Sequence, residues 1–319
     1  MKSFAYARAE SVREARELLG SPGARLLMGG TDLLTLLKER LVEPERLVDL
    51  GGAASLRGIS LDGERLRIGA LTTLAELERH DATPGVIRDA LADAATPQLR
   101  NVATVGGNLL QRNRCWYFRS EAHRCWLKGG SACLAVEGDG RYHAIFGEGE
   151  CRMVTPSDLA PALMALDATV GVDVDGDERR LPVASLYAVP TERRREEHAV
   201  GSRDVITFVE IARDALARHG TYLKFMDRAT WAFAVVSVAA SAVVINRRVQ
   251  DVRLVAAAVA SVPWRVREAE ELLEGERVDE NSARAAAERF VRDALPLKDN
   301  GYKVEILREL VRRSLLLLV

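Results

Sequence analysis

The four cysteines are the residues of this chain best suited to chemistry, because they all fall between positions 115 and 151. They are Cys115, Cys125, Cys133 and Cys151. The N-terminus shows no apolar signal segment, and in such a chain clustered thiols are more typical of metal ligands than of disulfides. Four thiolates are what a cubane iron–sulfur cluster needs, although no C-x-x-C pair is present. Zinc, with His123 or His143 as a further ligand, and free buried thiols are the competing interpretations.

Two glycine pairs form a second group of candidate binding residues. Residues 26–33 and residues 103–109 each contain an apolar run, then Gly-Gly, then a polar residue. Glycines allow backbone N–H groups to approach a phosphate closely, and the first segment also leads into a helix N-terminus, which favours an anion. Two such segments on one pyrophosphate would suit a dinucleotide. Neither matches a Rossmann or Walker fingerprint, and an ordinary turn is the alternative for each.

Short strands and capped helices are expected to position these segments. Strands are predicted at residues 24–28, 47–50 and 66–70. Helix N-termini are predicted at Ser11 and Thr73, which have capping-box spacing, at the first glycine pair and at Pro84. From residue 109 to about residue 152 the pattern is irregular and rich in aromatic residues, which is typical of a functional loop rather than of disorder.

Regular structure resumes after the cysteines. A helix is predicted from Asp158 to Leu166, followed by strands at residues 169–174 and 180–183. The charged run at 188–203 predicts a solvated linker. Beyond it, two apolar runs separated by residues 246–248 predict a β-hairpin, and three helices follow. We therefore expect an α+β protein with a first domain at 1–187, a linker at 188–203 and a second domain at 204–319.

Charge and composition exclude several classes of function. Forty-five Lys+Arg against 46 Asp+Glu leave a formal charge of −1, so no field of one sign is available to bind nucleic acid non-specifically. The longest apolar run, residues 231–245, is shorter than the roughly 20 residues of a membrane span. We expect no nucleic-acid partner, no membrane span and a cytoplasmic location, unless a signal-bearing partner subunit carries the chain to the periplasm.

Several motifs in a fixed order resemble one known family. In the first domain these are LLMGGTDLL at 26–34, RNVATVGGNL at 100–109 and PSDLAPAL at 156–163; in the second they are TYLK at 221–224 and NGYKV at 300–304. The chain resembles the FAD-binding medium subunit of the molybdenum hydroxylases, the xanthine dehydrogenase and aldehyde oxidase family. This resemblance implies a two-part FAD-binding domain of the vanillyl-alcohol-oxidase/PCMH type. A C-terminal α+β flavoprotein domain with a small antiparallel sheet and helices would follow it.

The cysteine segment, about 109–152, resembles one branch of that family. Bacterial periplasmic aldehyde oxidoreductases and 4-hydroxybenzoyl-CoA reductase insert a [4Fe-4S] segment between the second glycine segment and the Ser-Asp-Leu-Ala-Pro helix. By this resemblance the four cysteines are the cluster ligands, while a structural zinc stays open because the spacing differs from that of ferredoxins.

The resemblance also implies a set of FAD-binding residues. They are Leu26, Leu27, Met28, Gly29, Gly30, Thr31, Asp32, Leu33, Thr104, Gly106, Gly107, Asn108, Gln111, Asp158 and Lys224. The two glycine segments would hold the pyrophosphate through backbone N–H groups. Asp158 would bind ribose hydroxyls or, alternatively, cap the helix that follows it. Lys224 would stabilise negative charge on reduced flavin, with an ordinary surface lysine as the alternative.

No substrate-oxidising catalytic residue is expected on this chain. The family resemblance implies a large molybdopterin subunit, which oxidises an aldehyde or N-heterocycle, and a small subunit with two [2Fe-2S] clusters. The medium subunit would pass electrons to an external acceptor such as a ferredoxin, a quinone or oxygen. The alternatives are a free-standing FAD oxidase, a zinc-stabilised scaffold without redox function, and a 4-hydroxybenzoyl-CoA-reductase-like complex that runs in the reductive direction.

Overall fold

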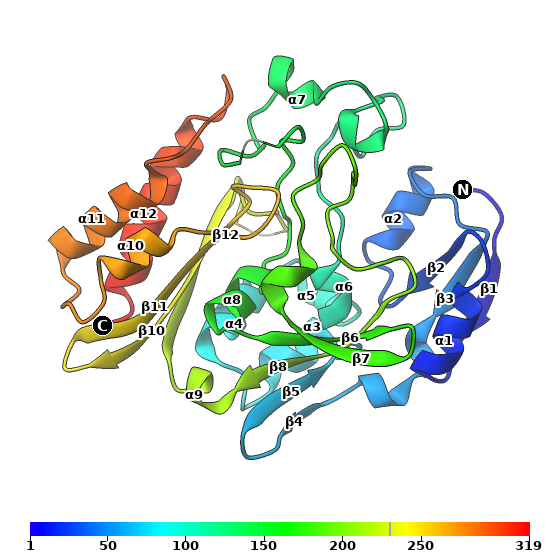
Figure 1. The fold of residues 1–319 in the computed structure, drawn as a ribbon, viewed down its shortest axis with the longest axis horizontal. Coiled ribbons are helices and arrows are strands. Elements are labelled where there is room, and N and C mark those ends of the chain that lie inside the picture. Colours follow the sequence, from blue (N-terminus) through cyan, green and yellow to red (C-terminus); the bar gives the residue numbers. More distant parts are fainter. Residues whose placement is uncertain (148, 230) are drawn as a thin grey trace.

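The computed structural model describes residues 1–147, 149–229 and 231–319. The chain begins with a parallel three-stranded sheet in the order β1-β3-β2, drawn in blue in Figure 1. Its strands are β1 (Ala5–Arg8), β2 (Ala24–Leu27) and β3 (Arg46–Asp49), and the helices α1 (Val12–Leu19) and α2 (Leu33–Lys38) connect them. The predicted capping residue Ser11 begins α1 and accepts a hydrogen bond from the Glu14 N–H at 3.2 Å. Helix α2 follows the first glycine pair directly, as expected.

An antiparallel five-stranded sheet in the order β4-β5-β8-β6-β7 follows. Its strands are β4 (Ile59–Leu61), β5 (Arg65–Gly69), β6 (Thr169–Val174), β7 (Asp177–Pro182) and β8 (Val205–Ala212). Strand β8 lies between β5 and β6 and pairs with both. Strand β8, which the sequence analysis assigns to the second domain, therefore pairs within a sheet of the first, and the domain bounds 1–187, 188–203 and 204–319 stay a prediction. Residues 188–203 lead the chain back into this five-stranded sheet.

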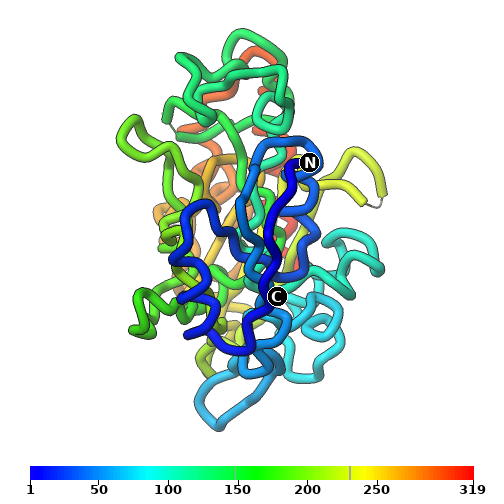
Figure 2. The backbone as a smooth tube through the Cα atoms, turned by 90° about the vertical axis from the view of Figure 1, so that its right-hand side faces the viewer, coloured from blue at the N-terminus to red at the C-terminus, as the bar shows by residue number. Residues whose placement is uncertain are grey.

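Short helices connect and cover these two sheets. They are α3 (Leu74–Arg79), α4 (Gly85–Ala92), α5 (Pro97–Arg100), α6 (Val105–Leu109), α8 (Leu159–Ala165) and α9 (Arg213–Leu216), with 3₁₀ turns at Leu50–Gly52, Ala54–Leu56 and Val183–Leu186. The capping box predicted at Thr73 is present, because the Thr73 and Glu76 side chains each accept the other's backbone N–H. In its described residues, the cysteine segment holds a 3₁₀ turn (Trp126–Lys128) and α7 (Leu134–Glu137), and it lies at one end of the molecule (Figures 1 and 2).

The last part of the chain is an antiparallel four-stranded sheet in the order β12-β11-β10-β9. Its strands are β9 (His219–Phe225), β10 (Val236–Ile245), β11 (Arg248–Ala257) and β12 (Trp264–Arg265). Three helices follow: α10 (Arg267–Glu271), α11 (Glu280–Val291) and α12 (Tyr302–Leu316). The β10–β11 hairpin is the predicted one, and Asn246 and Arg247 at its turn both have positive φ.

Burial of this sheet on both faces explains why β10 and the last four residues of β11, 254–257, are almost continuously apolar. Ala239 and Val255 face the core that includes α4 and α8, whereas their neighbours Val238 and Leu254 face the core that includes α11 and α12. Alternate residues of a strand point to opposite faces, so a strand covered on both sides needs no polar positions. The predicted α+β class is confirmed. No helix of the described ranges has the length and apolarity to cross a membrane.

Candidate functional site

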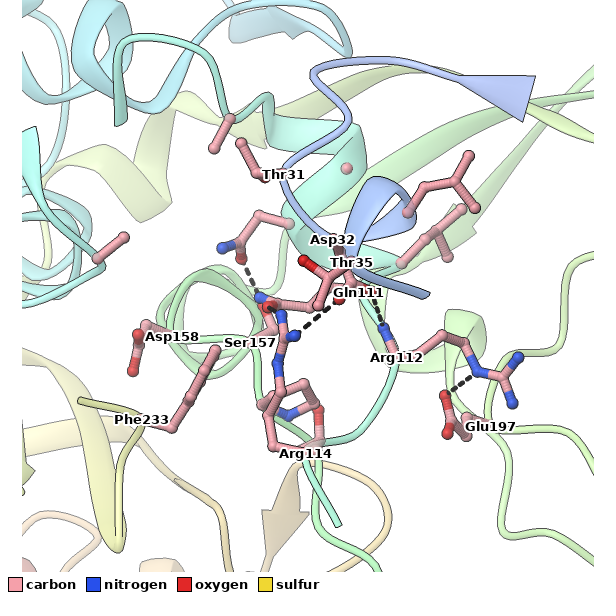
Figure 3. A pocket seen from close by; sticks show the side chains of 18 of the residues that line it. Thr31, Asp32, Thr35, Gln111, Arg112, Arg114, Ser157, Asp158, Glu197 and Phe233 are labelled. Carbon is pink, nitrogen blue, oxygen red and sulfur yellow. Dashed lines mark hydrogen bonds and ion pairs between the residues drawn. The ribbon is translucent and has the colours of Figure 1, made fainter. Parts of the chain in front are cut away.

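A large cavity of about 1170 Å³ lies where the two glycine segments, the start of α8 and the last domain meet. Pockets for small molecules usually measure about 300–1,000 Å³, so this one has room for a cofactor of dinucleotide size. Figure 3 shows that its polar groups come from separate parts of the chain, with Thr31, Asp158 and Glu197 far apart in sequence around one space.

The first glycine segment has backbone donors to offer. Gly30 has a φ of +71°, a conformation that favours glycine. A Cβ on Gly29 would overlap the carbonyl oxygen of Val102, so this glycine allows the two glycine segments to touch. Among the hydrogen bonds of the described residues, none has the N–H of Asp32 or Leu33 as donor. These groups at the start of α2 suit an anion.

The second glycine segment forms α6, and the backbone donors of its two glycines are used within the chain. The N–H of Gly106 donates to the carbonyl of Ala70 at 2.9 Å, and the N–H of Gly107 donates to Thr104 Oγ1 at 3.2 Å. At these two glycines the structure differs from the expectation of free N–H groups. Both glycines line the cavity without a side chain, and a Cβ on Gly106 would press against Met28.

Asp32 fastens the first glycine segment to the start of the cysteine segment. Its Oδ1 lies 2.8 Å from Arg114 Nη1, and its Oδ2 accepts the N–H of Arg112 at 2.7 Å (Figure 3). The same Oδ1 lies 2.8 Å from Arg119 Nη2. The two guanidinium groups offset the charge of Asp32, so this carboxylate does not by itself repel an anionic ligand.

Arg114 also reaches across the cavity to the last domain. Its Nη2 donates to Gln111 Oε1 at 2.9 Å, and its guanidinium lies over the ring of Phe233, 4.4 Å from the centroid (Figure 3). The cation–π contact links the first domain to the last one at the edge of the cavity.

Asp158 is a buried carboxylate with two partners from the last domain. Tyr222 donates to its Oδ1 at 2.6 Å, and Lys224 Nζ lies 2.9 Å from its Oδ2. Burial raises the pKa of Asp158, and the Lys224 charge and the two hydrogen bonds act against that rise. The alternative role as a helix cap belongs instead to Ser157, whose Oγ accepts the Ala160 N–H at 3.0 Å.

Thirteen of the fifteen expected FAD-binding residues line the large cavity. The other two are Leu27, which ends β2, and Lys224, whose side chain is fully buried against Asp158. The tuning role expected of Lys224 stays a prediction, since its ammonium group is held by a carboxylate.

All four cysteines line one small cavity of their own, here called the cysteine cavity. Its other walls are apolar and aromatic, with Phe118, Trp126, Leu127 and Met153 buried around it. Leu36 of α2 belongs to the same cluster of buried side chains, so the cysteine segment packs directly on the helix that follows the first glycine pair.

The thiols differ in their electrostatic surroundings. Burial raises the pKa of Cys115 to about 12. A hydrogen bond from the Cys151 thiol lowers the pKa of Cys133 to about 6 and raises that of Cys151. Metal ligation requires thiolates, so the positive charge of a metal centre has to offset the burial of these sulfurs.

Cys115 is shared by the two cavities. It lines the cysteine cavity and, together with Trp116, Tyr142 and His143, it also lines the large cavity. The Nε2 atom of His143 lies 3.1 Å from Cys115 Sγ, and burial lowers the pKa of this histidine to about 4, so the ring is neutral. A group held by the cysteines would therefore lie directly beside a ligand of the large cavity.

Comparison with known proteins identifies the family. Residues 2–212 match "FAD binding domain in molybdopterin dehydrogenase", and residues 221–318 match "CO dehydrogenase flavoprotein C-terminal domain". The chain is 36% identical over 311 residues to the aldehyde oxidoreductase FAD-binding subunit PaoB of Escherichia coli, covering 95% of this chain and 94% of that one. The chain belongs to the FAD-binding medium subunits of the molybdenum hydroxylase family. It binds FAD and is a flavoprotein component of an oxidoreductase.

Other medium subunits agree with this assignment. The carbon monoxide dehydrogenase medium chain of Afipia carboxidovorans is 41% identical over 111 residues, which are 33% of this chain and 38% of that one. Carbon monoxide dehydrogenase of Hydrogenophaga pseudoflava shares the fold, with a TM-score of 0.79 at 23% identity over 99% of this chain and 97% of that one. The predicted order of an FAD-binding domain and a C-terminal flavoprotein domain is confirmed.

The predicted linker contributes residues that sequence reasoning missed. Glu197 is buried, and its carboxylate accepts hydrogen bonds from Arg112 Nε at 2.6 Å and from the Asn113 side chain. Arg195 donates to the carbonyl of Trp126 at 2.8 Å and lies over its ring. A run of charges usually indicates a solvated surface, whereas here the partners are residues far back in the chain.

Proposed function

We propose that this medium subunit holds FAD in the large cavity and a [4Fe-4S] cluster in the cysteine cavity. It would pass electrons between a partner subunit and an external acceptor. The observation that carries the proposal is the position of Cys115, which lines both cavities. When bound, the flavin can exchange one or two electrons and the cluster exchanges one. The residues of this chain bind the two groups, keep water from the cluster and set the surrounding charge.

The donor set favours a cluster over a single zinc ion. Zinc draws its sulfur ligands to about 2.3 Å, so four thiolates must converge on one point. In the described part of the chain, no group of three His, Cys, Asp or Glu side chains lies close enough to hold one ion. The four cysteines are instead distributed around a cavity. Four thiols with apolar and aromatic walls would suit a cubane, whose iron and sulfide core would separate Cys133 from Cys151, now joined by a hydrogen bond.

The likeness to an aldehyde oxidoreductase subunit over 95% of the chain supports an aldehyde as the substrate of the complex. An N-heterocycle is the second candidate, because a nicotinate dehydrogenase FAD subunit of Eubacterium barkeri is 24% identical over 243 residues, which are 74% of this chain and 67% of that one. The partners would be a large molybdopterin subunit, on which the substrate is oxidised, and a small subunit with two [2Fe-2S] clusters. Neither substrate needs a catalytic residue on this chain.

The external acceptor would be a ferredoxin, a quinone or oxygen rather than NAD. A one-electron centre beside the flavin suits a partner that accepts electrons singly. Steady-state turnover of the reconstituted complex with each acceptor tests this proposal. NAD as the fastest acceptor would refute it.

The cluster is tested by Cys125→Ser and Cys133→Ser, with Ser131→Ala as the control because Ser131 is an exposed residue of the same segment. Each cysteine variant of the complex should lose about four irons per medium subunit and the broad absorption of a thiolate-ligated cluster, while FAD stays bound. The control should keep both cofactors. Unchanged iron in both cysteine variants, or zinc in place of iron in the unmodified protein, would contradict the proposal.

A further inference from the structure

The end of the cysteine segment is fastened to the last domain by two buried side chains near the start of α12. Asn300 Nδ2 donates to the carbonyls of Gly140 at 3.2 Å and His143 at 3.0 Å. Lys303 Nζ donates to the carbonyls of His143 at 2.9 Å and Ala258 at 2.6 Å. Both side chains bond the same carbonyl, that of His143. Residues Asn300 and Lys303 are called the clamp below.

The clamp is built from groups that are costly to bury. Asn300 and Lys303 are both 0% exposed. Among the ion pairs of the described ranges, none includes Lys303, and its recorded acceptors are backbone carbonyls. A buried ammonium group without a carboxylate destabilises a fold unless its hydrogen bonds are satisfied. The carbonyls of Tyr142, His143 and Ala258 satisfy the Lys303 ammonium group, and burial lowers its pKa to about 7, so it carries its full positive charge only below that pH.

The residue that the clamp holds contacts a proposed cluster ligand. The Nε2 atom of His143 lies 3.1 Å from Cys115 Sγ. The ring also packs edge-on against Trp116, with the two ring centroids 5.3 Å apart. A thiolate that binds iron has no proton to give, so Nε2 must be the donor in this contact. Because the backbone of His143 is fixed from α12, the point from which this donor extends toward Cys115 is held in place.

We propose that His143 is a positioning residue that donates a hydrogen bond to the Cys115 thiolate, that the clamp holds it there, and that together they raise the reduction potential of the cluster. The inference rests on the proposed function, since it requires the cluster. A hydrogen bond to a ligand sulfur and a buried cation both stabilise the more negative, reduced state of an iron–sulfur centre. The last domain would thus adjust a centre whose ligands all come from the first domain.

The test is a redox titration of the cluster in the intact complex, followed by electron paramagnetic resonance, with iron counted in every variant. His143→Leu removes the donor, whereas His143→Gln keeps an N–H that can reach the same sulfur. Lys303→Met removes the buried charge. Lys298→Met is the matched control, because exposed Lys298 also bonds the cysteine segment from the last domain, at the Glu137 carbonyl (2.6 Å), but lies in solvent.

His143→Leu and Lys303→Met should each shift the equilibrium between reduced and oxidised cluster at least tenfold toward the oxidised form, which is about 59 mV for one electron. His143→Gln should recover much of this shift, and Lys298→Met should show none. Unmodified protein without cluster iron would refute the proposed function and not only the clamp. With the cluster present, equal potentials for His143→Leu, His143→Gln and the unmodified complex would overturn the inference, even if Lys303→Met lost its iron.

Discussion

Removing Lys224 should be among the most destabilising single changes in this protein, because it would strand the carboxylate of Asp158 in the wall of the large cavity. The Lys224 side chain is 0% exposed and that of Asp158 is 8% exposed. Breaking a buried ion pair by deleting one partner costs about 3–5 kcal/mol, and Lys224→Met falls in this range. Arg312, which pairs with Glu309 and Glu280 at the surface, is the control, and Arg312→Met should cost much less than Lys224→Met.

The pair predicts a strong coupling between the two positions. Lys224→Met combined with Asp158→Asn leaves no stranded charge, and Tyr222 can still donate to the new amide oxygen. The double variant should therefore be more stable than the sum of the single changes implies, by about 2 kcal/mol or more. Burial raises the pKa of Asp158, and losing the cation raises it further. The folded Lys224→Met protein then binds more protons than the unfolded chain, so its loss of stability should be larger at pH 8 than at pH 5.

Chemical denaturation of the FAD-loaded protein, followed by circular dichroism and flavin fluorescence at both pH values, measures these quantities. Additive costs in the double variant would refute the assignment of a coupled buried pair. The same conclusion would follow if Lys224→Met cost no more than Arg312→Met. If Lys224→Met kept the stability of the unmodified protein but changed the reduction potential of the flavin, Lys224 would instead have the role expected from the sequence, stabilising negative charge on reduced flavin.

Two further predictions concern the same cavity. Gly29→Ala should lose FAD and stability, because the new Cβ would overlap the Val102 carbonyl oxygen. Gly85→Ala, whose Cβ meets open space, should retain both, and a full flavin content in Gly29→Ala would contradict the prediction. His198 lines the cavity, and burial lowers its pKa to about 4, so the unfolded chain binds the extra proton between about pH 6.5 and pH 4. As the pH is lowered from 6.5 to 4, the free energy of unfolding should decrease by up to about 3 kcal/mol in the unmodified protein and by less in His198→Gln. An equal pH dependence in these two proteins would disprove the assignment.

Features with a local cause could be predicted from the sequence. The capping residues Ser11 and Thr73, the hairpin turn at 246–247 and the helix after the first glycine pair all depend on neighbours in the chain. The glycine segments could also be predicted, because the absence of a side chain is a property of the residue itself and depends on no distant partner.

Features that depend on distant partners could not be predicted in this way. Glu197 reads as part of a solvated charged run, because its partner Arg112 precedes it by 85 residues. Asp158 reads as a free ligand or a cap, because its lysine partner follows 66 residues later. Strand β8 reads as the start of a new domain, since the identity of its neighbours β5 and β6 is decided by sheet pairing. In each case tertiary contact overrides the local pattern.

The ion pairs of Asp32 with Arg114 and Arg119 of the cysteine segment have a consequence for how such subunits can gain or lose this segment. The segment is not a detachable module, because deleting it would leave the Asp32 carboxylate without Arg114 and Arg119 and would uncover Leu36 on α2. A medium subunit that lacks the segment must therefore give the Asp32 position other partners and cover the α2 surface in another way. Grafting the segment into such a subunit would require replacing those partners and that cover, besides adding the cysteines.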